Sequence, residues 1–487
     1  RDSVRALQNN ETDTMLVGAV DFTGDLRYLA THHHIRPYSA AASLLPFDSS
    51  ARGTLPGEGG TALVLKRLED ALAEKDRIYA TINGFGAASG MAKEMGGISQ
   101  EADQVSLERV IQEAEIDLSK LSLFEAHGSG IHTEDAIESK VLNTISTDTG
   151  LHCAVNSTKA IVGHTGAASG LSSLVKTSLC LYHALIPPMP GYRSPGEIAW
   201  GKRFHVPIKP QYWFRDRESG PRRACVGVMT SDGNCSHVLL EEYEDAGTTI
   251  TAEAVRERLR PLGYQPGGLF VVEGDESHEI VEGLKALWDQ IRKGIAKELP
   301  MELLARVWYE KMGCQPGKKR ALSLVIRDIH EAENEIHKAK QLVASGNRDT
   351  APGHANIFYT PEPLGASADI AFVFPGSGHH YLGMGRDMGT QWPLILRRMD
   401  AETRQLKKQM IPEYFMPYRR SWETQWETQA LHRIHSDPLW AIFGQVMHGC
   451  VAARLMLQFM TPPGAIIGYS LGETAGLIAM GVWKGQD

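Results

Sequence analysis

Short apolar runs alternate with amphipathic stretches through the first half of the chain. Thr14–Val20 and Ala62–Leu65 have the length and composition of buried strands, and Glu101–Ala114 has apolar residues at helical spacing. Leu121–Glu125 is a further predicted strand, and a short loop of alanine, histidine, glycine and serine follows it directly. This alternation predicts a layered α/β fold, in which His127 stands just beyond a strand end, where such folds place their chemistry.

The pattern changes after residue 243. Residues 244–369 combine charged helical stretches with two isolated strand-like runs, Leu269–Glu273 and Ala321–Arg327, which predicts a small connecting α/β domain. From Ile370 a new apolar strand opens a third region. We therefore expect three domains, at residues 1–243, 244–369 and 370–487.

Length and composition agree with this division. At roughly 150 residues per domain, a chain of 487 residues predicts about three domains. A hydrophobic content of 42% and a charged content of 22% are typical of globular proteins, so disordered, collagen-like and coiled-coil classes are excluded. The net charge of −8 disfavours a globally basic binder of nucleic acid or of anionic membranes.

Neither a membrane span nor a metal site is predicted. The most apolar segment, Gly464–Trp483, is interrupted by Glu473 and is rich in glycine. The six cysteines form no CxxC pair and have no metal-ligand spacing, which favours a reducing cytoplasm. The consecutive histidines His32, His33 and His34 are predicted to form a surface loop, because three adjacent side chains cannot all face one ion.

Two histidines between small residues form the first candidate site. His127 follows a predicted strand, and His164 follows Lys159 at a second strand end, before a helix start of small residues. Glycines on either side allow close backbone approach, and two converging imidazoles suit the stabilisation of an oxyanion or enolate. Lys159 would hold one histidine by a hydrogen bond or tune its charge. A single such histidine favours a structural role, whereas two favour a functional site.

These segments resemble the two histidine motifs of the β-ketoacyl synthase (ketosynthase) domain of polyketide and fatty-acid synthases. Pro46–Asp48, Gly57–Gly59 and Leu65–Leu68 look like the PFD, GEG and LKRL motifs of that family, and Asp232–Glu242 looks like its closing motif. The resemblance implies that the first domain is the C-terminal part of a thiolase-like ketosynthase, a kind of domain that forms homodimers.

The resemblance also implies roles for the candidate residues. His127 and His164 would assist decarboxylation of a malonyl extender and stabilise the resulting enolate and thioester oxyanion, and Lys159 would organise the site. The nucleophilic cysteine of the family would lie upstream of Arg1, so we expect the chain to be an excerpt of a longer protein. Cys153 and Cys235 are expected to be buried small residues rather than nucleophiles.

Four residues near the histidines depart from the family pattern. Ser129 stands for a threonine, Ile131 and Glu134 replace a threonine and a glycine, and Gly166 stands where many relatives carry glutamate. The histidines are kept, so decarboxylation is expected. The alternative is a non-condensing ketosynthase domain, of the chain-length-factor or structural kind, which keeps the fold without the nucleophile.

A serine between glycines forms the second candidate site. Gly468–Gly472 is a GxSxG pattern that follows an apolar strand and precedes a helix of small residues. On such a tight turn Ser470 would be a nucleophile, and the N–H of Leu471 would bind an oxyanion. An α/β-hydrolase has the same turn and is the competing interpretation.

The upstream segment Phe372–Gly385 resembles the opening of malonyl/acyl-CoA:ACP acyltransferases, which favours that family over a hydrolase. Ser470 then maps onto its acyl-accepting serine. Gly376 and Ser377 would support the oxyanion, with Ser377 in the place of a glutamine of the family. The family's catalytic histidine and carboxylate-binding arginine would lie beyond Asp487.

The order of these motifs predicts a type I polyketide-synthase-like or polyunsaturated-fatty-acid-synthase-like protein with a ketosynthase, a linker and the N-terminal part of an acyltransferase. The resemblance implies that the full-length protein loads malonyl or acyl units from CoA and passes them to the phosphopantetheine thiol of an acyl carrier protein. The full-length protein would then condense these units by decarboxylative chemistry at its ketosynthase. No bound cofactor and no metal are expected in these residues.

Overall fold

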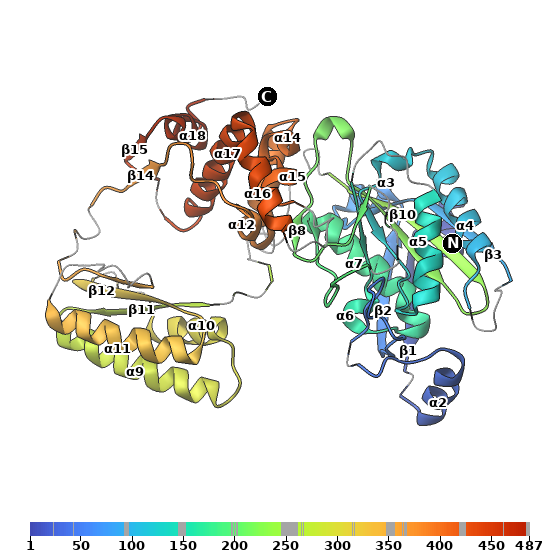
Figure 1. Cartoon of the computed structure of the whole chain (residues 1–487), viewed down its shortest axis with the longest axis horizontal. Coiled ribbons are helices and arrows are strands. Elements are labelled where there is room, and N and C mark those ends of the chain that lie inside the picture. The colour runs from blue at the N-terminus through green and yellow to red at the C-terminus, as the bar shows by residue number, and fades with distance from the viewer. Residues whose placement is uncertain are drawn as a thin grey trace. The chain divides into compact units, whose positions relative to one another are not determined.

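The computed structural model describes the chain apart from residues 23, 42, 92–96, 145–151, 196–197, 199, 201–202, 245–261, 264, 266, 314, 316, 347–355, 363, 365–367, 418–424, 461 and 484–487. The chain forms two compact units, and each is described by itself (Figure 1). The units are Arg1–Pro261 with Phe372–Thr461 and Ile466–Asp487, and Leu262–Ala371 with Pro462–Ala465. Because residues 245–261 lie outside the described part, the predicted boundaries between the three domains stay predictions.

The first unit is built on a six-stranded mixed sheet with the strand order β3-β10-β9-β4-β5-β7. Its strands are β3 (Thr81–Ser89), β4 (Leu123–Glu125), β5 (Cys153–Asn156), β7 (Phe204–His205), β9 (Arg223–Met229) and β10 (Asn234–Glu241). β10 pairs antiparallel with β3 and β9, whereas β4 runs parallel to β9 and β5. β4 therefore lies inside the sheet, and all its residues are buried.

Helices cover both faces of this sheet. Side chains alternate along β4, so neighbouring residues of this strand contact helices on opposite faces. The covering helices are α4 (Gln100–Ala114), α5 (His132–Thr144) and α7 (Ser169–His183). Phe124 packs with Leu107 of α4 and Val141 of α5, whereas its neighbour Leu123 packs with Leu181 of α7. Figure 1 shows α4 and α5 on one side of the sheet and α7 on the other. The predicted layered α/β arrangement is confirmed for this part.

A second, two-stranded sheet packs against the other side of α7. It consists of β1 (Thr14–Asp21) and β2 (Gly59–Lys66), which pair antiparallel. The prediction of buried strands is half wrong, because Leu16 is 73% exposed and its cross-strand partner Val64 is 68% exposed. The run is apolar on both faces, so its composition does not reveal that only one face is covered.

Short elements complete this part of the unit: α1 (Asp2–Gln8), α2 (Leu26–Ile35), α3 (Leu68–Glu74), α6 (Lys159–Val162), β6 (Leu185–Ile186), β8 (Gln211–Tyr212) and the 3-10 turns Leu118–Lys120, Gly166–Ala168 and Arg217–Ser219. His32, His33 and His34 belong to α2, so the predicted loop is wrong. The apolar residues around them, from Leu26 to Ile35, are compatible with a helix. No group of three metal-ligating side chains occurs among the described residues.

The later segment of the first unit pairs strand β14 with β15, and helices pack against one face of this pair. Its elements are β14 (Ala371–Phe374), α12 (Arg386–Gln391), α13 (Pro393–Glu402), α14 (Leu406–Met410), α15 (Pro412–Phe415), α16 (Trp426–Ser436), α17 (Pro438–Met456), β15 (Ala465–Gly468) and α18 (Leu471–Ala479). Phe374, Met399 and Cys450 share one core with Ala184 and Tyr212. The hydrophobic core is thus continuous with the residues around β6 and β8.

A buried ion pair joins the same two segments, because Arg215 lies 3.3 Å from Asp400 of α13. Beside it, Arg222 donates to Glu242 of its own segment over 2.8 Å. Burial alone would raise the pKa of Glu242, but the charges of Arg222 and Arg215 hold it below its usual value. Buried charges are tolerated when they are paired, and removing one partner is strongly destabilising.

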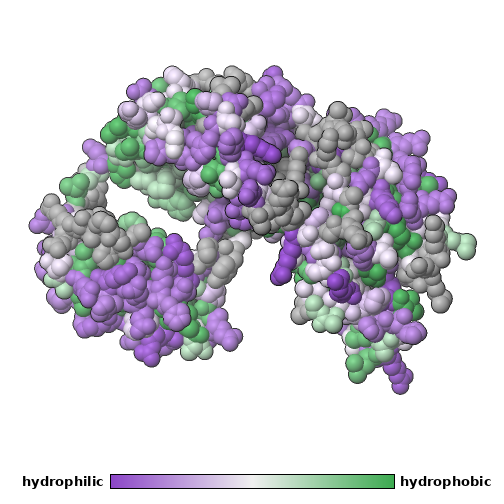
Figure 2. Space-filling model, viewed as in Figure 1, coloured by the Kyte–Doolittle hydropathy of each residue, from purple (hydrophilic) through white to green (hydrophobic). Residues whose placement is uncertain are grey.

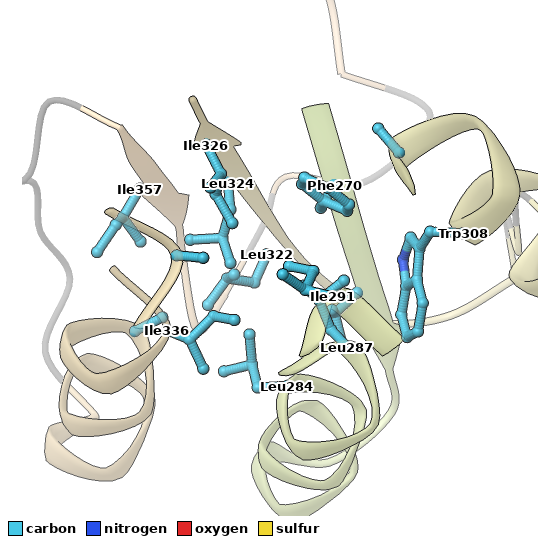
Figure 3. Packing of buried hydrophobic residues seen from close by; sticks show 14 of the residues in the cluster. Phe270, Leu284, Leu287, Ile291, Trp308, Leu322, Leu324, Ile326, Ile336 and Ile357 are labelled. Carbon is cyan, nitrogen blue, oxygen red and sulfur yellow. The ribbon is translucent and has the colours of Figure 1, made fainter. Parts of the chain in front are cut away.

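The second unit is a three-stranded antiparallel sheet with helices packed against it. Its elements are β11 (Gly268–Gly274), α9 (Ser277–Ile295), α10 (Met301–Met312), β12 (Arg320–Ile326), α11 (Ile329–Ser345) and β13 (Ile357–Tyr359). Ile280, Leu284, Leu287 and Ile291 follow helical spacing on α9 and turn one apolar face to the sheet. Figure 3 shows Leu284, Leu287 and Ile291 facing side chains of the strands, and the face of this unit that Figure 2 shows is largely hydrophilic.

Both predicted strands of the connecting segment are confirmed within one residue at each end. Trp308 of α10 closes one side of this core, and its indole N–H donates to the carbonyl of Val271 over 2.7 Å.

Throughout the described residues, the helices are too short or too polar to cross a membrane.

Candidate active site

The loop that carries His127 is held by two buried carboxylates of α5. Glu138 accepts the backbone N–H groups of His127 and Gly128, over 2.7 and 2.9 Å. Asp135 accepts the N–H of Phe47 over 2.7 Å and that of Gly130 over 3.3 Å. Gly128 has a φ of +49° and Gly130 a φ of +75°, which explains the two glycines that follow the histidine.

The imidazole of His127 is fixed in one tautomer by donors to its Nδ1 atom. The N–H of Met229, at the end of β9, donates to Nδ1 over 3.2 Å. Lys159 Nζ lies 3.3 Å from the same atom and donates to the main-chain oxygen of His127 over 2.6 Å. Because Nδ1 is an acceptor, the proton of the neutral ring is on Nε2. Lys159 and Met229 together therefore hold His127 in place.

His164 has the same arrangement on a different loop. Its Nδ1 accepts the backbone N–H of Gly166 over 3.1 Å, so its Nε2 also carries the proton. Its own N–H donates to Leu55, and its carbonyl accepts from Gly57. A side chain at Gly57 would meet the carbonyl of Val162 at 2.2 Å. The glycine-rich stretch before β2 is thus required for close approach to this loop.

The two imidazoles lie close together in the wall of one cavity. Their centroids lie 5.7 Å apart and the ring planes make an angle of 78°. Both rings line a cavity of about 550 Å³, which extends along apolar residues of β1, β2 and α7 such as Val17, Leu63 and Leu174. Within the described part of the chain, His127 Nε2 is buried and has no partner. A buried donor without a partner is costly unless a ligand accepts from it.

Burial keeps both histidines neutral. Desolvation lowers the pKa of His127 well below its usual value, and the nearby charge of Lys159 lowers it further. The pKa of His164 is lowered by the same two causes in the same order. Burial lowers the pKa of Lys159 to about 8, against the opposing attraction of Glu138. At pH 7 two neutral N–H donors thus face the cavity beside a lysine that is still mainly charged.

The carboxylates that hold the loop are strongly perturbed by the same burial. Desolvation raises the pKa of Asp135 to about 7, although the N–H of Phe47 lowers it. Desolvation likewise raises the pKa of Glu138 to about 7, although the N–H groups of Gly128 and His127 oppose this. The carboxyl groups of Asp135 and Glu138 therefore form their hydrogen bonds to the loop away from water.

The departures from the family pattern have structural partners. Ser129 Oγ accepts the N–H of Ile131 over 3.1 Å. Glu134 forms a buried ion pair with Arg36. A side chain at Gly166 would meet Asp21 Oδ2 at 1.9 Å. Asp21 instead accepts the N–H of Ala167 over 2.8 Å, so its carboxylate fills the space beside that glycine.

Several cavity residues were not predicted from the sequence. Arg36 and His32 line the cavity, and the charge of Arg36 contributes to the lowered pKa of both His127 and His164. Tyr28 stacks on His32, with centroids 4.0 Å apart. No local motif marks these positions, because α2 approaches the histidines only in the folded chain.

The described cysteines do not contribute a thiolate. Cys153, Cys180, Cys225, Cys235 and Cys450 are free and buried. Burial raises the pKa of Cys153 and of Cys235 to about 12, and none of the described cysteines lines the cavity. The prediction that Cys153 and Cys235 are buried is confirmed, and Cys314 lies outside the described residues.

Ser470 stands on a strained turn between β15 and α18. Its backbone has φ 54° and ψ −116°, a conformation that residues other than glycine rarely adopt. Side chains at Gly468 and Gly472 would meet the N of Glu473 at 2.3 Å and the carbonyl of Phe374 at 2.1 Å. The glycines of the GxSxG pattern are therefore required by close packing, and Ser470 itself is exposed.

The loop after β14 lies against this turn. A side chain at Gly376 would meet Tyr469 Cδ1 at 2.7 Å, and the N–H of Tyr469 donates to Phe374 over 3.2 Å. Leu471 is the first residue of α18, so its N–H has no acceptor within the helix. Ser377 is exposed on the same loop. The predicted residues Gly376, Ser377 and Leu471 thus lie on the two segments that meet at Ser470.

We predict that Glu138→Gln loosens the His127 loop. An amide has one acceptor oxygen, so one of the two N–H groups now bound by Glu138 loses its partner. A lost buried hydrogen bond costs about 1–3 kcal/mol. Hydrogen–deuterium exchange of the peptide that holds His127 and Gly128 should become at least about tenfold faster. The exposed Glu113→Gln change on α4 serves as the control, and unaltered exchange in Glu138→Gln contradicts this account.

Comparison with known proteins agrees with this geometry. Residues 2–71 match the model of the N-terminal domain of β-ketoacyl synthases, and residues 79–193 match the model of the C-terminal domain. Polyketide synthase PksL of Bacillus subtilis is 36% identical over 257 residues, which are 49% of this chain and 5% of that protein. One of the subunits of a polyunsaturated fatty acid synthase from Thraustochytrium is 28% identical over 526 residues, covering 99% of this chain and 24% of that protein.

Among solved structures, the ketosynthase from module 6 of the bacillaene synthase of Bacillus subtilis has a TM-score of 0.47 at 25% identity, covering 73% of this chain and 59% of that one. The chain spans 5% and 24% of the length of the two curated relatives. Both histidine loops lie within residues 79–193, and the two matched segments, residues 2–71 and 79–193, belong to the β-ketoacyl synthase family.

Proposed function

We propose that this chain supplies the decarboxylating histidine pair of a ketosynthase in a polyketide- or polyunsaturated-fatty-acid-type synthase. The observation that carries this proposal is the buried Nε2–H of His127, which has no partner among the described residues, in a ring that lies beside His164 in the wall of the cavity. The similarity to synthases over 99% of the chain supports the same assignment.

The proposed reaction uses the two N–H donors together. A malonyl thioester enters with its carbonyl oxygen toward Nε2 of His127 and His164. The bond between the carboxylate and the α-carbon breaks, CO₂ leaves, and the electron pair forms an enolate with negative charge on that oxygen. Donors that are already oriented stabilise this charge without reorganisation, and one such donor typically contributes about 10²–10³-fold in rate. Lys159 keeps the His127 ring in the donor tautomer.

Condensation requires an acyl group on a second nucleophile. The enolate carbon then attacks the acyl thioester, and the enzyme thiol leaves. The described cysteines are buried, so this thiol would come from elsewhere in the full-length protein. The alternative is a non-condensing ketosynthase domain, which keeps the fold without the nucleophile. Acylation of a cysteine in the full-length protein, blocked by iodoacetamide, distinguishes a condensing from a non-condensing domain.

We further propose that Ser470 accepts an acyl or malonyl group from CoA. Its Oγ would attack the thioester carbonyl and release CoA, and the oxyester would pass to the phosphopantetheine thiol of an acyl carrier protein. The strained φ of 54° at Ser470 and the N–H of Leu471 at the start of α18 support this role. Gly376 and Ser377 would lie beside the oxyanion that forms when Ser470 attacks the thioester. Among the described residues we assign no general base to Ser470.

The partners follow from this chemistry. We propose malonyl-CoA or acyl-CoA as donor, an acyl carrier protein as acceptor, a homodimer formed through the ketosynthase, and a cytoplasmic location. No bound cofactor is required for either reaction, because thioester and enolate chemistry need only oriented donors and nucleophiles.

We predict that His127→Ala and His164→Ala in the full-length protein each lower CO₂ release from malonyl carrier protein by about 10²–10³-fold. The KM for malonyl carrier protein should change little, because the donors act on charge that develops during the reaction. The measurement is the rate of labelled CO₂ release, with the exposed His278→Ala as the control. Rates equal to wild type in either variant would remove that histidine from the mechanism.

For the acyltransferase, we predict that Ser470→Ala abolishes labelling of the full-length protein by radioactive malonyl-CoA or acyl-CoA at the serine. Decarboxylation of malonyl groups already on carrier protein should continue, since the histidine site does not use Ser470. The exposed Ser436→Ala on α16 is the control. Labelling of Ser470→Ala at the wild-type level would refute the acyl-transfer assignment.

A further inference from the structure

A buried glutamine of α17 holds the loop that lies against Ser470. The Nε2 atom of Gln445 donates to the carbonyl of Gly376, and its Oε1 atom accepts the N–H of Gly378 over 3.2 Å. Both ends of one amide therefore bind the backbone on either side of Ser377. Gln445 is only 6% exposed, so water does not compete strongly for these hydrogen bonds.

The loop that Gln445 holds is in direct contact with the serine turn. A side chain at Gly376 would meet the carbonyl of Tyr469 at 3.1 Å as well as its ring. On the other side of the turn, a side chain at Gly472 would meet the carbonyl of Phe374 at 2.1 Å. The backbones of loop and turn thus touch without intervening side chains, and a displacement of the loop is transmitted to the surroundings of Ser470.

One backbone donor of this loop is left available. The carbonyl of Gly376 and the N–H of Gly378 are occupied by Gln445, whereas the N–H of Ser377 between them donates to no acceptor within the described residues. Its position depends on the two pinned neighbours. Leu471 supplies the other free N–H, from the start of α18.

We propose that Gln445 is a positioning residue for acyl transfer, which fixes the Gly376–Gly378 backbone against the Ser470 turn and so sets the geometry of the oxyanion donors. This inference rests on the proposed function of Ser470. It gives α17, which lies outside the GxSxG motif, a role in positioning the oxyanion donors. Misplacement of such donors by about 1 Å costs on the order of 10²-fold in rate.

Two substitutions separate positioning from packing. Gln445→Met has nearly the same volume and removes both hydrogen bonds. Gln445→Glu keeps the acceptor for Gly378 but, when ionised, loses the donor to Gly376 and places a charge beside its carbonyl oxygen. When protonated, the glutamic acid regains a donor. The exposed Gln458→Met change, just beyond α17, is the matched control.

The experiment measures acylation of Ser470 in single turnovers of the full-length protein with radioactive malonyl-CoA. For Gln445→Met we expect the rate at saturating CoA ester to fall about 10–100-fold, with KM within about twofold of wild type and CO₂ release at the histidine site unchanged. For Gln445→Glu we expect the rate, relative to wild type, to rise as the pH falls and the carboxyl gains its proton.

The outcomes distinguish this inference from the function it rests on. If Ser470→Ala remains labelled, the acyl-transfer function fails. If Ser470→Ala is unlabelled and Gln445→Met reacts like Gln458→Met, only the role of Gln445 is overturned. If Gln445→Met fails to fold, Gln445→Glu decides, because a rate without pH-dependent recovery overturns the positioning role and recovery at low pH supports it.

Discussion

The structure of the histidine site depends on the burial of two carboxylates beneath one loop. Glu138 and Asp135 accept backbone N–H groups of His127, Gly128, Gly130 and Phe47, which would otherwise be buried without partners. An unpaired buried N–H costs about 1–3 kcal/mol, so these bonds decide whether the loop can enter the core at all. Because the carboxylates come from α5, the helix after the loop fixes the loop itself.

Burial then determines the chemistry of the site. The same desolvation that raises the pKa of Glu138 lowers that of His127 and His164, so the imidazoles are neutral at pH 7. Neutral imidazoles whose Nδ1 accepts a backbone N–H are N–H donors through Nε2, and this is what an enolate oxygen needs. The serine turn uses a different constraint, since Gly468 and Gly472 allow backbones to touch and force Ser470 outward.

The sequence predicts the local parts of this account and misses the distant ones. Helical spacing placed α4 almost to the residue, and glycines around His127 and His164 marked both loops. Met229 and Asp21 could not be found in this way, because they lie 102 and 146 residues from the groups they bind. The exposed face of β1 was also missed, because a strand with apolar residues on both faces does not indicate which face packs against a helix.

The pH dependence of decarboxylation tests the central claim, that both histidines act as neutral donors, most directly. The rate of CO₂ release from malonyl carrier protein by the full-length protein should show no loss caused by protonation of either imidazole as the pH falls from about 7.5 through about 6.5, the usual pKa of histidine, because burial lowers the pKa of both rings. A change caused by Asp135 and Glu138, whose pKa is about 7, should occur at the same pH in His164→Ala. An acid limb centred near the usual histidine pKa that shifts in His164→Ala would contradict the account.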